Sequence, residues 1–208
     1  MIKGDLIMGI VATTNDGSGG YAQVPAGVHK ARCVKIIDLG TQRQEFNGEV
    51  SWKRQVMLIW EIPGQDNMNG EPMTISKFYT LSLHEKSNLG ADLTSWRGRA
   101  FTETEKQGFD ISNLKGVACM LNVLEGNNGK SKISGIMPLA KGDDMPEQYN
   151  DSLVFSVDEY QQGNKEAFNQ LSDGIRRMVM RCKELEGNDI DMGDGNNDVE
   201  LGSDDVPF

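Results

Sequence analysis

The stretch WKRQVMLIWEIP, residues 52–63, constrains the fold of this 208-residue chain more than any other segment. From residue 56 onward, apolar residues occupy its even positions, and polar residues such as Lys53, Gln55 and Glu61 fall among the odd positions. The apolar residues are Val56, Leu58, Trp60 and Ile62. Because successive side chains of a strand point to opposite faces, this alternation predicts a β-strand with one buried face.

A second strand is expected directly after the first. Residues 66–70, DNMNG, have the composition of a turn, and residues 72–81, PMTISKFYTL, have that of a strand. The two strands are therefore expected to be neighbours in one sheet. On this interpretation Lys53, Lys77 and Tyr79 lie on the more polar side of the pair.

A change of period after these strands predicts a helix within the segment HEKSNLGADLTSWRG. The apolar residues at helical spacing are Leu89, Leu93 and Trp96. Ser87 is placed to cap the N-terminus of this helix, and Gly98 is placed to end it. The segment FTETEKQGF is expected to form a further short helical turn, because Thr102 and Glu105 have the spacing of a capping box.

Three further strands complete the predicted sheet. VHKARCVKIIDLG, residues 28–40, comes first and is followed by a polar stretch, while VACMLNVL and KSKISGIMPL flank the turn GNNG as a hairpin. Strand, strand, strand, helix, strand, strand is the element order of a five-stranded OB-type Greek-key barrel with an inserted helix. The predicted fold class is therefore mainly β. In such barrels one face and two loops bind oligonucleotides.

A helix is expected from Asn164 to about Leu185, because apolar residues recur there in steps of three and four. The residues of this seam are Phe168, Leu171, Ile175, Met178, Cys182 and Leu185. We expect the seam to pack on the chain's own barrel, with a coiled-coil homodimer as the alternative. The chain is thus predicted to divide into an OB-fold DNA-binding domain (1–142), a linker with a C-terminal helix (143–186) and a disordered acidic tail (187–208).

Charge is unevenly distributed along the chain, whose net charge is -10. Residues 1–142 carry 16 Lys and Arg against 14 Asp and Glu, and residues 143–186 carry 5 against 10. Residues 187–208 carry 0 against 7. The excess of acid is therefore concentrated at the C-terminal end, and the barrel remains able to present a basic face to nucleic acid.

Neither an enzyme nor a metal protein is indicated. The three cysteines, Cys33, Cys119 and Cys182, lack CxxC spacing and are expected to be buried thiols in a reducing compartment. The two histidines, His29 and His84, form no pattern of a catalytic triad. GNNGKS is not a phosphate-binding loop, because its context is strand–turn–strand. We expect no catalysis, no cofactor and no metal.

A membrane location is not indicated either. No stretch approaches the ~18 uncharged apolar residues of a membrane span, and the start MIKGDLIMGIV has too short an apolar run for a secretory signal. We expect a cytoplasmic protein, in the cytoplasm of the host cell if the chain is encoded by a phage.

Three segments place an aromatic residue beside basic ones: WKR (52–54), KFY (77–79) and WRGR (96–99). Single-stranded nucleic acids are held by this combination, because bases stack on aromatic rings and Lys or Arg neutralise phosphates. Trp60, Phe78 and Trp96 are expected in the core, so Trp52 and Tyr79 are the preferred stacking residues. The candidate DNA-binding residues are Trp52, Lys53, Arg54, Lys77, Tyr79, Arg97, Arg99 and Lys132.

The last residues, DDVPF, resemble the C-terminal tip of bacterial single-stranded DNA-binding proteins. The matching residues are Asp204, Asp205, Val206, Pro207 and Phe208. The barrel resembles phage-encoded OB-fold single-stranded DNA-binding proteins, notably in SKFYTLSLHEKSNL and WRGRAFT. The segment 100–107 and the helix before the tail depart from the bacterial proteins, so their tetramer and site size are not carried over.

The resemblance implies a non-catalytic protein that coats single-stranded DNA during phage or plasmid replication and recombination. Its acidic tail would compete with phosphate for the same cations, and its tip would recruit replication and recombination proteins through Phe208. Two alternatives stay open. One is a scaffold whose barrel binds another protein, with the tail providing solubility; the other is a nuclease that uses a carboxylate cluster and a divalent metal.

Overall fold

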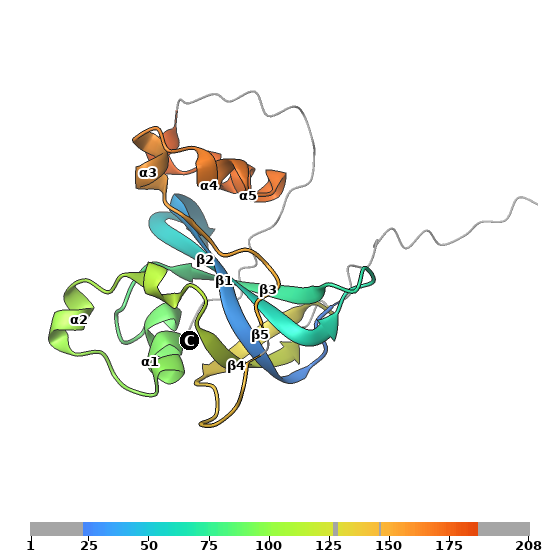
Figure 1. Ribbon diagram of the computed structural model, residues 1–208. Helices are drawn as coiled ribbons and strands as arrows, with labels where there is room; N and C mark the ends of the chain where they lie inside the picture. The colour runs from blue at the N-terminus through green and yellow to red at the C-terminus, as the bar shows by residue number, and fades with distance from the viewer. Residues whose placement is uncertain (1–22, 127–128, 146, 187–208) are drawn as a thin grey trace, which may run out of the picture.

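The computed structural model describes residues 23–126, 129–145 and 147–186 (Figure 1). The strands are β1 (Gly27–Phe46), β2 (Glu49–Asp66), β3 (Pro72–Thr80), β4 (Ala118–Glu125), β5 (Ser131–Met137) and β6 (Leu153–Phe155). The helices are α1 (Asn88–Arg97), α2 (Glu103–Gln107), α3 (Val157–Gln161), α4 (Glu166–Asn169) and α5 (Asp173–Met180), with 3-10 turns η1 (Ile111–Leu114) and η2 (Lys183–Leu185). The predicted acidic tail, 187–208, with its tip lies outside the described residues.

The strands form one six-stranded sheet in the order β3-β2-β1-β4-β5, and β6 pairs with β1. All neighbours are antiparallel except β6, which runs parallel to β1. The end strands β3 and β5 lie close to each other, but no backbone ladder joins them in the described part of the chain, so the sheet is open. The prediction of a mainly β chain with a helix between the third and fourth strands is confirmed.

The longest feature of the sheet is the hairpin of β1 and β2, whose register runs from Arg32 opposite Glu61 to Phe46 opposite Glu49. The prediction that the first strand ends at Gly40 is wrong. The polar residues that follow continue β1 as far as Phe46, next to the hairpin turn. The turn residues Asn47 and Gly48 have φ values of 51° and 82°. This left-handed pair is the connection that Asn-Gly favours between antiparallel strands, and it allows polar residues to continue the ladder.

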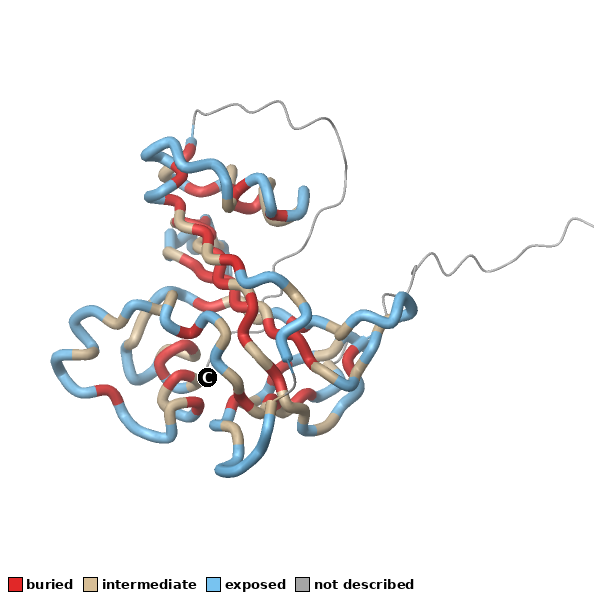
Figure 2. Tube along the Cα trace, viewed as in Figure 1, coloured by how far each residue is buried: buried red, intermediate tan, exposed pale blue. Residues whose placement is uncertain are grey.

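The larger hydrophobic core lies between the sheet and α1, which forms as expected. Ser87 accepts a hydrogen bond from the N–H of Gly90, and Gly98 ends the helix at a φ of 67°. Trp60 and Trp96 are 0% and 4% exposed, and their ring centroids are 5.9 Å apart. The expectation that these two rings belong to the core is confirmed, and α1 therefore closes one side of the sheet (Figures 1 and 2).

A second core forms where residues 153–185, which we call the C-terminal module, cover the far end of the β1–β2 hairpin (Figure 2). The prediction of one continuous helix is wrong: the chain forms α4, α5 and η2 with turns between them. Ser172 and Cys182 both have extended backbone at these breaks. Ser, Asp and Asn hydrogen-bond nearby backbone in non-helical conformations, which favours a break around residues 169–173.

The seam residues nevertheless pack on the chain's own sheet, as the preferred prediction had it. Phe168, Leu171, Met178, Cys182 and Leu185 are buried in one cluster with residues of the hairpin. The hairpin residues of this cluster are Ile37, Leu39 and Met57, with Ile59 and Phe78 packed against it. Since the seam is covered within the chain, we expect no self-association through it.

Two further observations concern thiols and membranes. All three cysteines are free and buried, as expected. Among the helices of the described residues, none combines the length and the apolar character that crossing a bilayer requires.

Candidate nucleic-acid interface

Lys77 and Tyr79 of β3 do not lie on the polar side of the strand pair, so this expectation is wrong. Their register places Tyr79 opposite Val56 and Lys77 opposite Leu58, on the face that the core buries. Tyr79 is 2% exposed. Its hydroxyl and the Lys77 ammonium both donate to Oδ2 of Asp92 in α1, each at 2.8 Å.

This arrangement fixes α1 to β3 rather than presenting a ring to solvent. The Lys77 ammonium lies 5.2 Å from the centroid of the Tyr79 ring, and the Lys77 and Asp92 side chains are 16% and 17% exposed. The aromatic–basic segment KFY therefore forms a structural contact in this conformation, in which no base can reach the ring of Tyr79.

The two arginines of WRGR converge on Glu105. Arg97 donates to Oε1 of this carboxylate, and Arg99 donates to both oxygens at 2.8 and 3.0 Å. Hydrogen bonds from Arg99, from the backbone N–H of Thr102 and from Arg97 lower the pKa of Glu105 well below its usual range. Thr102 also completes the predicted capping box of α2.

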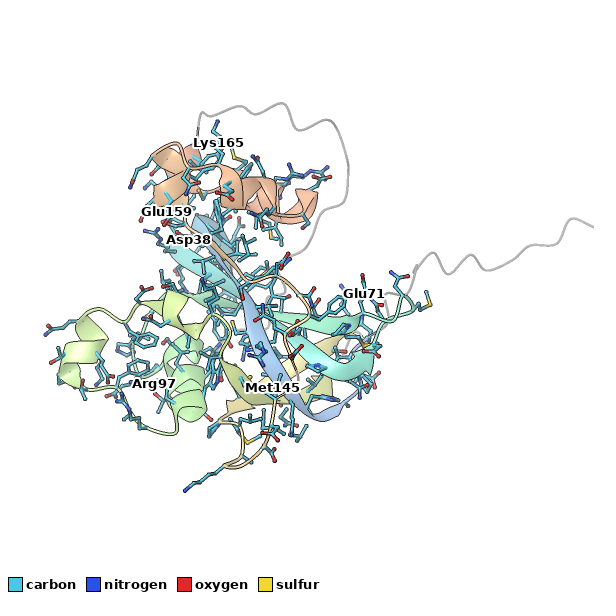
Figure 3. The ribbon with its side chains drawn as sticks, viewed as in Figure 1. Asp38, Glu71, Arg97, Met145, Glu159 and Lys165 are labelled. Carbon is cyan, nitrogen blue, oxygen red and sulfur yellow. The ribbon has the colours of Figure 1, made fainter. Side chains whose placement is uncertain are left out.

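Arg97 is further enclosed by aromatic rings. Its guanidinium carbon lies 4.2 Å from the Phe101 centroid and 5.3 Å from that of Phe109, and its side chain is 16% exposed. The charges of Arg97 and Arg99 are thus directed at one carboxylate, and Arg97, labelled in Figure 3, joins the 98–110 segment to the end of α1.

The third segment, WKR, lies on β2, in the half of the β1–β2 hairpin that ends in the Asn47-Gly48 turn. We call residues 41–54 the distal hairpin. Trp52 is 42% exposed there, and Phe46 and Val50 are 56% and 48% exposed. The distal hairpin therefore presents large apolar side chains to solvent, in contrast to the other two segments.

Arg54 has a structural role within this segment. Its guanidinium donates to both carboxylate oxygens of Asp38, at 3.3 and 2.6 Å, and to Asp158 of α3 at 3.2 Å. These hydrogen bonds, with that to Asp38 foremost, raise the pKa of Arg54. Asp38 also accepts from the backbone N–H of Val157 at 3.2 Å, so this network joins the hairpin to the C-terminal module (Figure 3).

Trp52 and Lys53 do not share a face, because neighbouring strand residues point to opposite sides. Lys53 lies opposite Gln42, whose amide donates to the carbonyl of Met178 at 3.0 Å. Trp52 lies opposite Arg43. The cation beside the Trp52 ring is therefore not Lys53, its neighbour in the sequence.

That cation is Lys183 of η2, whose ammonium lies 5.7 Å from the centroid of the Trp52 ring. The next residue, Glu184, accepts from the backbone N–H of Thr41 at 2.8 Å and from its hydroxyl at 2.6 Å, which holds η2 against the hairpin. Gly40 makes this approach possible: a Cβ there would lie 2.7 Å from the Sγ of Cys182, and its φ of 67° also favours glycine.

Sequence reasoning missed both Arg43 and Lys183. Arg43 faces Trp52 only because β1 continues past Gly40, which the Asn47-Gly48 turn signals. No local pattern indicates Lys183, since its place beside Trp52 depends on how η2 packs on β1.

The remaining candidate, Lys132, is exposed on β5 and lies opposite Leu124 of β4. The adjoining β4 residue Val123 pairs with Gly27, at the start of β1, whereas the distal hairpin lies at its other end. Lys132 and Trp52 therefore lie near opposite ends of β1, so they do not form one cluster.

Comparison of the sequence with protein-family models and with curated proteins finds no match. Within the described ranges, no three His, Cys, Asp or Glu side chains come together in a way that could hold a metal ion. The geometry of the distal hairpin is therefore the main guide to function.

Proposed function

We propose that this protein binds single-stranded DNA without catalysing a reaction and that the distal hairpin is the centre of its interface. The single observation that carries this proposal is the 42% exposed indole of Trp52 with the Lys183 ammonium 5.7 Å from its centroid. A flat ring beside a cation suits a nucleotide, whose base stacks on the ring while its phosphate meets the charge. Each base stacked in this way contributes about 1–3 kcal/mol.

The topology supports the same proposal. We interpret the open sheet as an OB-type barrel in which β3 and β5 approach without pairing. OB-type barrels bind oligonucleotides on the face of the second and third strands and on the loops that join the first two and the last two strands. In this chain the C-terminal module packs on Met57, Ile59 and Phe78 of that face. The turn that connects β1 and β2 lies within the distal hairpin, where Phe46, Val50 and Trp52 are exposed.

The acidic C-terminal segment gives the proposal a means of regulation and recruitment. Residues 187–208 carry 7 carboxylate side chains and no Lys or Arg, and one residue, Glu186, separates them from η2, which carries Lys183. Tethered carboxylates compete at high effective concentration with phosphate for the same cations. When DNA displaces the segment, Phe208 and the preceding Asp-Asp-Val-Pro residues become available to replication and recombination proteins, as in the family that this tip resembles.

Fluorescence anisotropy tests the proposed function. Labelled single-stranded DNA, duplex DNA and RNA of equal length are titrated with the full chain and with a chain that lacks residues 187–208. We expect tighter binding to single-stranded DNA than to the duplex, weaker binding as salt rises, and tighter binding once the acidic segment is removed. Equal binding to duplex and single strands, or no binding at low salt, contradicts the proposal.

A protein-binding scaffold is the second candidate, and the exposure of Phe46 and Val50 at 56% and 48% favours it. Exposed apolar side chains gathered on one element are typical of protein contacts. This alternative predicts a partner that co-purifies after nuclease treatment and is lost in Phe46→Ser/Val50→Ser, whereas single-stranded DNA binding is absent in the wild-type chain.

A further inference from the structure

Two lysines of the C-terminal module lie over aromatic rings at the same distance but in different settings. The ammonium of Lys183 is 5.7 Å from the Trp52 centroid, and that of Lys165 is 5.7 Å from the Tyr160 centroid. Tyr160 is 7% exposed, whereas Trp52 is 42% exposed. Of these two rings, Trp52 alone has enough exposed surface for a base to stack on it.

The backbone around Lys183 is held in place while its side chain is exposed. Glu184 is bound to both the N–H and the hydroxyl of Thr41, and its carbonyl accepts from the amide of Gln161 at 2.8 Å. The close contact of Cys182 with Gly40 fixes the other side of η2. The ammonium therefore extends on a flexible stem from a fixed point beside the hairpin.

We propose that Trp52 and Lys183 form a subsite for one nucleotide, with the base on the indole and the phosphate on the ammonium. In the free protein the Lys183 ammonium lies over the ring; in the complex the base takes this place and the ammonium moves to the adjoining phosphate. This inference rests on the proposed binding of single-stranded DNA and adds that the C-terminal module supplies part of the site.

The placement of the neighbouring charges agrees with this assignment. Arg43, directly opposite Trp52, forms a solvent-exposed ion pair with Glu45, in which both side chains are 53% exposed. Such pairs are weak, so Arg43 can turn to the next phosphate along the strand. Arg54, in contrast, remains bound to Asp38 and Asp158. The path of the strand is therefore expected to run from Lys183 across Trp52 towards Arg43.

The test measures how salt affects the binding of labelled oligo-dT to the full chain and to four variants, one of which, Trp52→Ala, removes the ring. Lys183→Met keeps the length of the side chain but removes its charge, Lys183→Arg keeps the charge, and Lys165→Met is the matched control. The slope of log affinity against log salt changes by about 0.7 for each phosphate contact to a single strand. We expect Lys183→Met to make this slope shallower by about 0.7 and to weaken the affinity by about 3- to 10-fold. Lys183→Arg and Lys165→Met are expected to bind like the wild-type chain.

The outcomes separate this inference from the proposed function. If the wild-type chain binds oligo-dT but Lys183→Met keeps its slope, the subsite is refuted while the binding of single-stranded DNA by the chain stands. The subsite is also refuted if Lys183→Met lowers the slope while Trp52→Ala binds with unchanged affinity, since the base would then stack elsewhere. If the wild-type chain does not bind single-stranded DNA at all, the proposed function and the subsite are both wrong.

Discussion

The face of the sheet beneath α1 and the distal hairpin carry the same kinds of side chain in opposite settings. Beneath α1, the Lys77 ammonium lies 5.2 Å from the ring of Tyr79, which is 2% exposed, and Asp92 binds both residues. At the distal hairpin, the ammonium of Lys183, which belongs to η2, lies 5.7 Å from the centroid of the Trp52 ring, which is 42% exposed. Where α1 covers the sheet and supplies a carboxylate, the pair of lysine and aromatic ring belongs to the core. Where no helix covers the ring, as at Trp52, the pair is a candidate binding site.

The largest effect is expected when the C-terminal module is removed. A chain that ends at residue 152 exposes Ile37, Leu39 and Met57, whereas the core beneath α1 keeps all its buried members and loses only the partly buried Val154 at its edge. We expect this chain to bind a hydrophobic dye and to lose its cooperative thermal transition or its solubility. A chain that lacks only residues 187–208 is the control and is expected to unfold like the full protein.

Substitution of the two rings to alanine sharpens the comparison. Tyr79→Ala is expected to lower the free energy of unfolding by about 3 kcal/mol, because a large buried side chain leaves a cavity. Trp52→Ala is expected to lower it by less than about 1 kcal/mol, because the ring is partly exposed. Urea denaturation of both variants measures these values, and equal losses would show that the two settings do not differ.

The carboxylate beneath α1 provides the next test. Asp92→Asn leaves the Lys77 ammonium, 16% exposed, without its charged partner, and we expect a loss of about 2 kcal/mol. Asp158→Asn is the matched variant near the hairpin; its carboxylate is 60% exposed, so the expected loss is below about 1 kcal/mol. A larger loss for Asp158→Asn in urea denaturation contradicts the comparison.

The smallest effect concerns Glu105 and depends on pH. The pKa of Glu105 in the folded chain is lowered from its usual 4.5. The carboxylate therefore contributes fully to stability above pH 4.5, and this contribution is lost as the pH falls towards the pKa of the folded state. We expect Glu105→Gln to melt at a lower temperature than wild type at neutral pH, with the difference shrinking in acid. Thermal melts across the acid range test this, and a constant difference would refute it.

Local patterns predicted the elements that local chemistry determines. Ser87 and Gly98 delimit α1, and Thr102 with Glu105 caps α2, because caps depend on a few neighbouring residues. The open edge between β3 and β5 could not be predicted, since it depends on how far the sheet curls. The breaks between α4, α5 and η2 were missed because the apolar spacing continues through them while the backbone does not.

The candidate site was predictable only in part, for the same reason. Trp52 was identified correctly as an exposed ring, whereas Tyr79 was placed on the wrong face because the register of β3 is not visible in its own sequence. Arg97 and Arg99 looked like free cations because their common partner, Glu105, lies on a separate turn. The assignment of DNA-binding residues stays a prediction, in which Trp52 of the distal hairpin and Lys183 of η2 are the residues that we favour.

The most direct test of the account is tryptophan fluorescence during titration with oligo-dT at low salt. Trp60 and Trp96 are 0% and 4% exposed, so a stacking base can reach only Trp52 among the three tryptophans. We expect quenching in the wild-type chain that weakens as salt rises and that is absent in Trp52→Phe. No quenching in the wild-type chain, or the same quenching in Trp52→Phe, would contradict it.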